Sequence, residues 1–349
     1  MDIEYTQRIK KIEAELERWL PAGSQSYSGL AIEIFQNAGK NAGTDDIDAL
    51  LAPGRDMVSR GGKRWRPLLM TLVCESLGGA DAALPFSPLV EFCHNASLIH
   101  DDIEDNSEQR RGKPAVHIIH GVDSAINCGS FLYFLSLSCL DSMENGETKS
   151  RIYSLWADCM RSLHFGQAID IRWHRETSLV PSPDDYYFMS GLKTGGLSRL
   201  AAGIGAYAAG ASPQTARQLE DAALKLGVGF QILDDVKNLT TGNPGKMRGD
   251  DLVEGKKSFP ILLYLQKYPY KNRKVFNYYH QAKMNGISVP EVEELIQALG
   301  ESGVLAEAEE KGRSLAGESR AVFLSAESAG ADGNVKDLLG GLIDKIISG

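Results

Sequence analysis

The stretch FCHNASLIHDDIED, residues 92–105, decides the fold prediction. Apolar residues recur through it and just before it at three- and four-residue spacing, which predicts one buried stripe of an α-helix. The stripe consists of Leu89, Phe92, Ala96, Ile99 and Ile103. On the same helix, Asp101 and Asp105 are one turn apart and share a face, with Asp102 beside them.

The charges of this helix end make it a candidate metal site. Four acids stand within the five residues 101–105 and repel one another. They also lie near the end of a helix, where the helix dipole disfavours negative charge. Mg²⁺ suits such a place, because it takes one or two carboxylates and completes its shell with water and phosphate oxygens. From this motif alone, a solvated acidic helix end is an equal alternative.

Residues 229–238, GFQILDDVKN, repeat the design. Asp234 and Asn238 are one turn apart, Asp235 is adjacent, and the polar residues again follow an apolar helical run. Two such motifs, more than a hundred residues apart in a helical chain, suggest facing helices that hold metal ions between them. Coincidence is the alternative.

Helical periodicity dominates the rest of the chain, and strand-like alternation is scarce. An amphipathic helix is expected over residues 1–20, with further helices around 65–78, 86–105, 121–141, 148–174, 184–209, 212–240 and 258–268. The breaks between them are too short for a domain linker. The sequence therefore predicts one all-α domain over residues 1–349, with its core at about 30–265 and a helical C-terminal region at 286–349.

Composition narrows the function classes. The 349 residues are 43% hydrophobic and 24% charged, as in ordinary globular proteins. The net charge of −9 argues against a nucleic-acid partner. Five cysteines stand singly, so neither a disulfide framework nor a zinc site is expected. The sequence shows no apolar signal core and no run of membrane-spanning length, which predicts a cytoplasmic protein without a membrane span.

Basic residues stand beside glycines and beside the acidic motifs. Glycine lets the backbone approach a ligand, and Arg or Lys contact phosphate. No glycine stands five residues before a Gly-Lys pair, so a nucleotide P-loop is not indicated. The pattern favours a phosphorylated small molecule, although an ordinary surface charge is the alternative for any single lysine. The residues are Lys63, Arg64, Arg66, Arg110, Arg111, Lys193, Lys246 and Lys256.

Together these segments resemble the trans-isoprenyl diphosphate synthase (polyprenyl synthetase) family, which includes geranylgeranyl and farnesyl diphosphate synthases. The matching elements, over about residues 30–265, are GGKRWRP, HNASLIHDDIEDNSEQRRG, GQAIDI, KTGG, FQILDD and GDDLVEGKKSFP, in the family's order. The resemblance implies an antiparallel helical bundle around a deep central cavity, a homodimer, and magnesium-dependent transfer of an allylic group to isopentenyl diphosphate.

The resemblance also implies roles for individual residues. The isopentenyl diphosphate site takes Lys63, Arg66 and His94, with Arg111 assisting and Arg64 in the same substrate-binding group. The allylic diphosphate is contacted by Arg110, Lys193, Thr194, Gln231, Lys246 and Lys256. Three Mg²⁺ ions are implied, held by Asp101, Asp105 and Asp234 with Asp102 and Asp235 beside them. The catalytic set is Asp101, Asp105, Lys193 and Asp234.

The implied reaction begins with departure of the allylic diphosphate as an anion, which metal ions and basic groups stabilise. The double bond of isopentenyl diphosphate attacks the carbocation, and a proton leaves from the adjacent carbon. The departed diphosphate is the candidate base, since the sequence offers no obvious side-chain base. An apolar, water-poor cavity would protect the cation from hydrolysis.

Two features leave the product and the activity class open. Small Ala96 and Ser97 stand where farnesyl synthases often carry aromatics, so a product longer than farnesyl is favoured, geranylgeranyl diphosphate first. The second motif ends in Asn238, where many members carry Asp, and Gly129-Ser130 replaces a frequent Gly-Asp. The alternatives are a terpene cyclase, which needs no second diphosphate site, and a non-catalytic regulatory subunit of a prenyl synthase.

Overall fold

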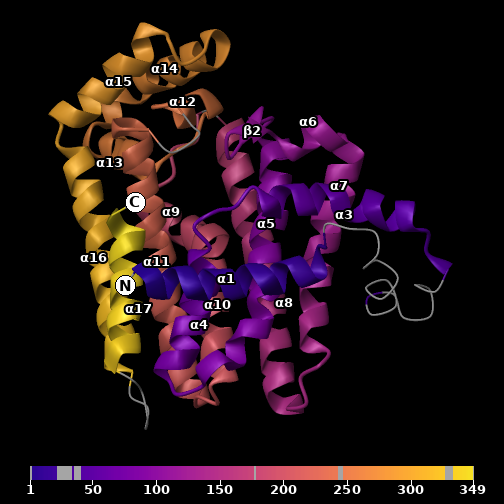
Figure 1. Ribbon diagram of the computed structural model, residues 1–349. Helices are drawn as coiled ribbons and strands as arrows, with labels where there is room; N and C mark the ends of the chain where they lie inside the picture. Colours follow the sequence, from indigo (N-terminus) through magenta and orange to yellow (C-terminus); the bar gives the residue numbers. More distant parts are fainter. Residues whose placement is uncertain are drawn as a thin grey trace. The chain divides into compact units, whose positions relative to one another are not determined.

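The structure is a computed structural model that describes residues 2–21, 34, 41–176, 178–242, 247–326 and 333–348. The regular elements of the described part are helices, mostly α-helices, apart from one small hairpin, as the helical periodicity predicts (Figure 1). The chain forms two compact units. Unit 1 comprises Met1–Leu155, Leu200–Ala216 and Glu327–Leu339, and unit 2 comprises Trp156–Arg199, Arg217–Ala326 and Gly340–Gly349.

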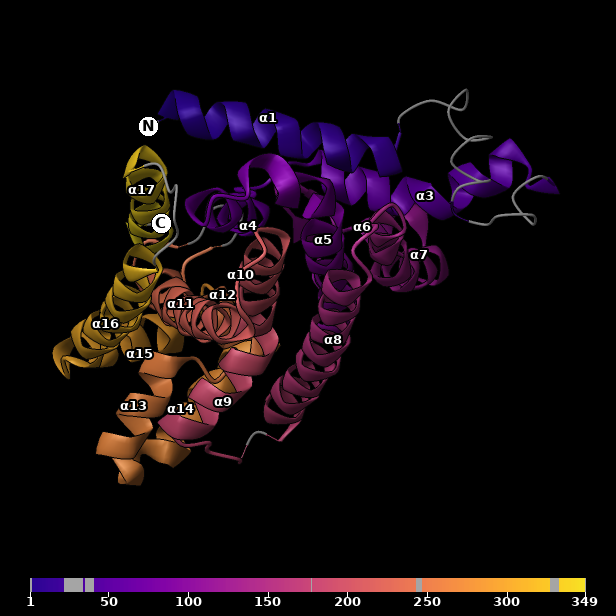
Figure 2. The same ribbon diagram turned by 90° about the horizontal axis from the view of Figure 1, so that it is seen from below.

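Unit 1 is built around helix α5 (Ser87–Glu104), which packs on most of the helices of the unit. Figure 2 shows α1 running along α4 and α5. Pro88 stands in the first turn of α5, where its missing N–H costs nothing, and the helix ends before Asn106, which has φ 53°. The other elements of the unit are α1 (Asp2–Trp19), α3 (Thr44–Ser59), α4 (Trp65–Ser76), η3 (Ala80–Phe86), β1 (Gln109–Arg110), β2 (Lys113–Pro114), α6 (Val116–His120), α7 (Val122–Leu135) and η4 (Ser136–Leu140).

The predicted stripe of α5 is the core of this unit. Leu89, Phe92, Ala96 and Ile99 are buried, and Ile103, near the helix end, is half-buried. Each fully buried large side chain contributes roughly 1.5–3 kcal/mol to the stability of the folded state. The stripe therefore fixes which face of α5 remains for polar residues.

Unit 2 gathers the second half of the chain around a core from α11, α13, α14 and α15. Its helices α13, α14, α15 and α16 pack on one another (orange in Figure 1). Four helices contribute residues to both units: α8 (Gly146–Arg175), α10 (Gly196–Ala208), α11 (Pro213–Thr240) and α17 (Gly333–Ser348). The remaining elements are α9 (Pro183–Ser190), the π-helix η5 (Gly191–Gly195), α12 (Asp250–Glu254), α13 (Phe259–Lys267), η6 (Pro269–Lys271), α14 (Asn272–Asn285), α15 (Pro290–Glu301) and α16 (Val304–Ser325).

The expected helices are confirmed. The segment expected at 184–209 is a single run of α9, η5 and α10, in which a π-helical turn replaces one α-helical turn. Helix α3 and the β1–β2 hairpin are absent from the sequence-based expectation. The prediction of one domain over residues 1–349 stays a prediction. None of the helices in the described part of the chain combines the length and the apolar character needed to cross a bilayer.

Candidate active site

The acidic end of α5 divides into one buried carboxylate and two that are more accessible. Asp102 is 1% exposed, and its Oδ1 accepts a hydrogen bond of 2.8 Å from Arg110 Nε. Burial raises the pKa of Asp102, and the Arg110 guanidinium opposes that rise. Asp101 and Asp105 are half-buried, with Asp101 Oδ2 3.8 Å from Arg110 Nη2. Asp102 therefore anchors Arg110, and Asp101 and Asp105 are the carboxylates presented at the helix end.

These donors fit magnesium. Among the described residues no group of three or more His, Cys, Asp or Glu side chains forms a ready-made metal cluster. Mg²⁺ does not require one, because it binds through one or two carboxylates together with water and substrate phosphate. The second oxygen of Asp102, Oδ2, is buried without a hydrogen-bond partner in the described part of the chain. Carboxylate oxygens are the ligands that a hard divalent cation such as Mg²⁺ prefers, so these residues are suited to bind one.

The hairpin after α5 sends two arginines back toward that helix. Gln109 pairs with Pro114 and Arg110 with Lys113, so Arg111 and Gly112 form a two-residue turn. Their φ angles of 54° and 73° are those of a type I′ turn, which matches the twist of paired strands. Arg110 thereby reaches Asp102, and Arg111 reaches Asn95 on α5.

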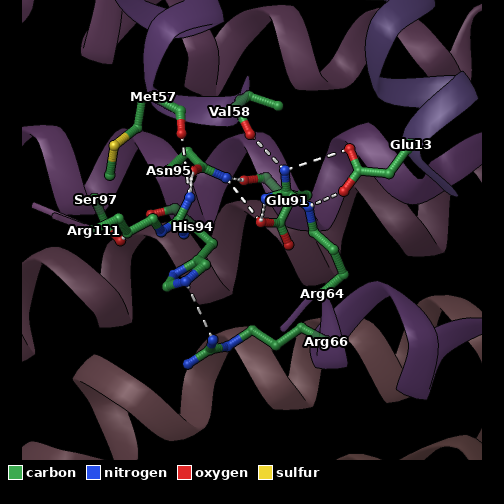
Figure 3. A network of polar contacts seen from close by, with 10 residues as sticks. All are labelled: Glu13, Met57, Val58, Arg64, Arg66, Glu91, His94, Asn95, Ser97 and Arg111. Carbon is green, nitrogen blue, oxygen red and sulfur yellow. Dashed lines mark hydrogen bonds and ion pairs between the residues drawn. The ribbon is translucent and has the colours of Figure 1, made fainter. Parts of the chain in front are cut away.

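Arg66, which is buried, forms a basic group with the half-buried His94 and Arg111 (Figure 3). Arg66 is 7% exposed and lies over the Trp65 ring, and its Nη1 is 3.4 Å from His94 Nε2. Burial lowers the pKa of both arginines to about 10, and Glu91 only partly opposes this. The pKa of His94 lies well below its ordinary range because of burial and of the neighbouring arginines. The group thus has more positive charge than its surroundings compensate, which is the condition for an anion site.

The glycine loop before α4 presents the remaining basic residues. Lys63 is exposed, and Gly61 and Gly62 have φ angles of 78° and 145°. A Cβ at Gly62 would lie 3.2 Å from Arg111 Nη2, so the loop passes directly against that guanidinium. Arg64 differs from its neighbours, because its guanidinium contacts Glu13, Glu91 and the carbonyl of Val58. The predicted contact between Arg64 and substrate would require these bonds to change.

In unit 2, the π-helical turn η5 positions Lys193 and Thr194. Lys193 Nζ donates to Asp170 on α8 over 2.6 Å, and Thr194 Oγ1 donates to Gln231 on α11 over 2.9 Å. Close glycine contacts hold the turn in place, since a Cβ at Gly166 would lie 2.7 Å from the Lys193 nitrogen. Such π-helical turns occur frequently at functional sites.

Lys193 belongs to a charge-matched group. Asp170 Oδ1 is 2.9 Å from His174 Nε2, and its other oxygen accepts from Lys193. Burial alone would raise the pKa of Asp170, but Lys193 and His174 outweigh it and hold that pKa below its ordinary value. Asp170, in the GQAIDI segment, is absent from the predicted site residues although it fixes one of them.

The second acidic motif also contains one buried and one accessible aspartate. Asp235 Oδ2 accepts from Tyr186 Oη at 2.7 Å and from the Phe259 amide at 2.9 Å, and Oδ1 accepts from Gln231 at 3.1 Å. Burial, with a smaller effect of Asp251, raises the pKa of Asp235 to about 7. Asp234, in contrast, is half-buried. Asp234 is therefore the better candidate ligand, and Asp235 joins three elements of the unit.

The structure also shows the surroundings of Asn238 and Lys256. Asn238 is 0% exposed, and in the described part of the chain neither its Oδ1 nor its Nδ2 has a hydrogen-bond partner. Lys256 forms an ion pair with Glu254 and lies 3.8 Å from Asp251. Lys246, expected to contact the allylic diphosphate, lies outside the described residues.

Sequence reasoning missed the residues that hold the others in place. Glu91 and Asn95 on α5 and Tyr186 on α9 are buried polar side chains that touch predicted site residues. The available signal was polarity at positions that helical periodicity assigns to a buried face. A glutamate beside Phe92 in the middle of an apolar helix needs a partner, and that partner is Arg64.

The family model for polyprenyl synthetase matches residues 47–298. Geranylgeranyl pyrophosphate synthase 2 of Zymoseptoria tritici is 40% identical over 65% of this chain and 69% of that protein. Geranylfarnesyl diphosphate synthase of Aeropyrum pernix is 35% identical over 63% of this chain and 71% of that protein. The fold is also that of geranylgeranyl pyrophosphate synthase from Corynebacterium glutamicum complexed with isoprenyl diphosphate and magnesium, with a TM-score of 0.79, 24% identity, and 97% and 98% of the two chains covered. The motifs, the helical fold and these matches agree, and the chain belongs to the polyprenyl synthetase family.

Proposed function

We propose that this prenyltransferase joins isopentenyl diphosphate to an allylic diphosphate and releases an all-trans polyprenyl diphosphate, with geranylgeranyl diphosphate as the first candidate product. The observation that carries the proposal is the uncompensated basic group of Arg66, His94 and Arg111 beside the acidic end of α5. His94 and Asp101 are seven residues apart on one helix, about 10 Å along its axis. One rigid element therefore carries a residue of each predicted diphosphate site.

The basic group and Lys63 bind the diphosphate of isopentenyl diphosphate. Arg66 and Arg111 supply forked N–H donors that match phosphate oxygens. His94, whose pKa is depressed, is a neutral donor or acceptor at pH 7. Burial chiefly lowers the pKa values of the two arginines and their mutual repulsion adds to it, and a bound anion opposes both effects. A terpene cyclase has no use for this second anion site.

We expect Asp101 and Asp105 in unit 1, and separately Asp234 in unit 2, to be the carboxylates that would hold magnesium ions for the allylic diphosphate. When bound, Mg²⁺ neutralises charge on the leaving diphosphate. Arg110, held by Asp102, contributes positive charge next to Asp101, and Lys193, Thr194, Gln231 and Lys256 contact the diphosphate in unit 2. That the two acidic motifs share metal ions, and that the ions number three, stays a prediction. Magnesium in the Corynebacterium glutamicum complex supports the choice of metal.

The reaction needs one bond to break and one to form. The allylic C–O bond breaks and its electron pair leaves with the diphosphate. The double bond of isopentenyl diphosphate then supplies the pair for the new C–C bond, and a proton leaves the adjacent carbon. None of the predicted site residues of the described part is an evident base, since His94 faces two arginines. The released diphosphate accepts the proton.

The lower face of α5 supports a product longer than farnesyl. One turn below Asp101 stands Ser97, a small, half-buried residue whose hydroxyl donates to the His94 carbonyl. One turn further, Cys93 is fully buried, with Sγ 3.4 Å from Ser136 Oγ on η4. A growing chain along this face passes Ser97 and meets the packed side chains at Cys93.

The predicted homodimer has a candidate surface in unit 1. Ile118 and Ile119 on α6 and Val122 and Ile126 on α7 are between 45% and 53% exposed. Four large aliphatic side chains gathered on two adjoining helices are more than a monomer surface usually exposes in one place. A second copy, packed through the same helices about a two-fold axis, would cover them.

The test is an assay of the purified chain with Mg²⁺, isopentenyl diphosphate and, in separate reactions, dimethylallyl or farnesyl diphosphate. We expect consumption of isopentenyl diphosphate and a twenty-carbon product. Asp101→Asn with Asp105→Asn should lower turnover at least a thousandfold, and Glu108→Gln, on the exposed segment that follows, should not. Cyclic hydrocarbon without use of isopentenyl diphosphate would identify a cyclase. Inactivity of a folded chain would identify the regulatory subunit.

A further inference from the structure

A chain of polar contacts runs from helix α1 to the predicted isopentenyl diphosphate site (Figure 3). Glu13 on α1 accepts from Arg64 Nε over 2.7 Å, and Arg64 Nη1 donates to Glu91 Oε1 over 2.7 Å. Asn95 Nδ2 donates to the same Glu91 oxygen over 2.9 Å, and Asn95 Oδ1 accepts from Arg111 Nη1 over 3.2 Å. The residues of the chain come from α1, the glycine loop, α5 and the hairpin.

The chemistry of Glu91 sets the direction of these bonds. A carboxylate paired with a guanidinium accepts hydrogen bonds, and Glu91, which is 2% exposed, forms such an ion pair with Arg64 over 2.7 Å. Asn95 must therefore turn its NH₂ toward Glu91, where it also donates to the Glu91 carbonyl over 2.7 Å. Its oxygen is left facing Arg111. The contact with Glu91 thus fixes the orientation of the Asn95 amide, whose oxygen accepts from Arg111.

Backbone carbonyls at the C-terminal end of α3 accept hydrogen bonds from both Arg64 and Arg111. Val58 O accepts from Arg64 Nη2 over 2.6 Å, and Met57 O accepts from Arg111 Nη1 over 3.2 Å. Carbonyls at a helix C-terminus attract positive charge. The hydrogen bonds of Arg111 to Met57 O and to Asn95 Oδ1 both come from Nη1. Within the described residues, Nη2 and Nε of Arg111 have no hydrogen-bond partner. Those two donors are the ones available to an anion.

We propose that Glu91 and Asn95 are positioning residues that hold Arg111 for isopentenyl diphosphate, and that Glu13 extends this control to the first helix. The inference rests on the proposed function, since it names what the oriented guanidinium binds. Arg64 then acts as the counter-charge of Glu91 rather than as a ligand. Glu91 also attracts Arg66 and Arg111, so it limits their mutual repulsion before the anion arrives.

The test compares Asn95→Ala and Glu13→Gln with Glu17→Gln, a control one turn further along α1 on an exposed position. Isothermal titration with isopentenyl diphosphate measures affinity without turnover. We expect affinity to fall about tenfold or more in Asn95→Ala, as for loss of a hydrogen bond to a charged group. Glu13→Gln should weaken it about twofold to threefold, because that side chain is partly exposed, and Glu17→Gln should not change it.

Two further readouts separate positioning from general damage. The KM for the allylic substrate should stay within twofold of wild type while the KM for isopentenyl diphosphate rises. In the double variant Glu13→Gln with Asn95→Ala, the loss should equal that of Asn95→Ala alone, because the chain of contacts is already broken. Additive losses, equal rises in both KM values, or unchanged affinity in a folded Asn95→Ala protein would overturn the inference. Binding without turnover in the wild type would defeat the proposed function alone, whereas absence of binding would defeat both.

Discussion

Replacing Arg66 by methionine should stabilise the substrate-free protein and weaken substrate binding. Burial lowers the pKa of Arg66 to about 10, roughly 2.5 below that of an ordinary arginine. At about 1.4 kcal/mol per pKa unit this is a cost of about 3 kcal/mol to the folded state. The variant also loses the cation–π contact with the Trp65 ring, which costs about 1 kcal/mol of stability. The net gain is about 2 kcal/mol.

The pH dependence of this gain follows from the sign of the shift. A base whose pKa is lower in the folded state destabilises that state at every pH below the folded value. The cost of Arg66 is therefore complete below pH 10 and constant between pH 6 and 9. The pKa of His94 should rise in the variant, because Arg66 is one of the charges that lower it.

Chemical denaturation at pH 7 measures the change, and a rise in Tm of about 2 °C should accompany it for a chain of this length. Titration by NMR follows the ring of His94. Isopentenyl diphosphate should bind the variant at least tenfold more weakly. A variant that is less stable than wild type, with unchanged affinity, would show that Arg66 is a structural residue and would refute the electrostatic account of the basic group.

Three other substitutions test separate features. Asn238→Leu should raise the free energy of unfolding by about 1–3 kcal/mol, measured by denaturation, because it removes two buried polar atoms that have no partner among the described residues. Gly62→Ala should raise the KM for isopentenyl diphosphate about tenfold, since its methyl group would lie 3.2 Å from Arg111 Nη2. Gly61→Ala is the control, with a positive φ of 78° and no neighbour within 4 Å. Tyr186→Phe should lower stability by about 1–3 kcal/mol, and more at pH 8 than at pH 5, because the lost hydroxyl stabilises the ionised form of its carboxylate partner on α11.

The sequence predicts the helices because burial repeats along them. The stripe from Leu89 to Ile99 is visible as spacing alone, and the acids and basic residues next to it identify the chemistry. Arg64 and Arg66 show that residue spacing alone does not predict what a side chain contacts. Arg64 has φ 47° at the start of α4 and turns into contacts with α1 and α5, whereas Arg66, in the first helical turn, reaches His94. No local pattern distinguishes them, since the difference depends on one backbone angle and on a glutamate 27 residues away.

The role of an individual aspartate is harder still to predict from the sequence, because one residue type can bind metal or stabilise the fold. Asp101 and Asp102 are adjacent, yet one is presented at the helix end and the other is buried under Arg110. Asp234 and Asp235 divide in the same way, with Asp235 held by Tyr186. In each motif, the second aspartate forms buried hydrogen bonds that stabilise the fold. The sequence motif alone does not separate it from the aspartates that are candidate metal ligands.

The two predicted diphosphate sites, one in each unit, differ in their balance of charge. In unit 1 the charges of Arg66 and Arg111 exceed those of the carboxylates around them, so an anion gains their full attraction on arrival. In unit 2 the charge of Lys193 is already matched by Asp170, which a phosphate must share or displace. Attraction from Lys193 alone is then small, and a diphosphate bound there depends on further positive charge, which the aspartates can recruit as metal ions. It follows that affinity for isopentenyl diphosphate should survive chelation of divalent cations, while affinity for the allylic diphosphate should not.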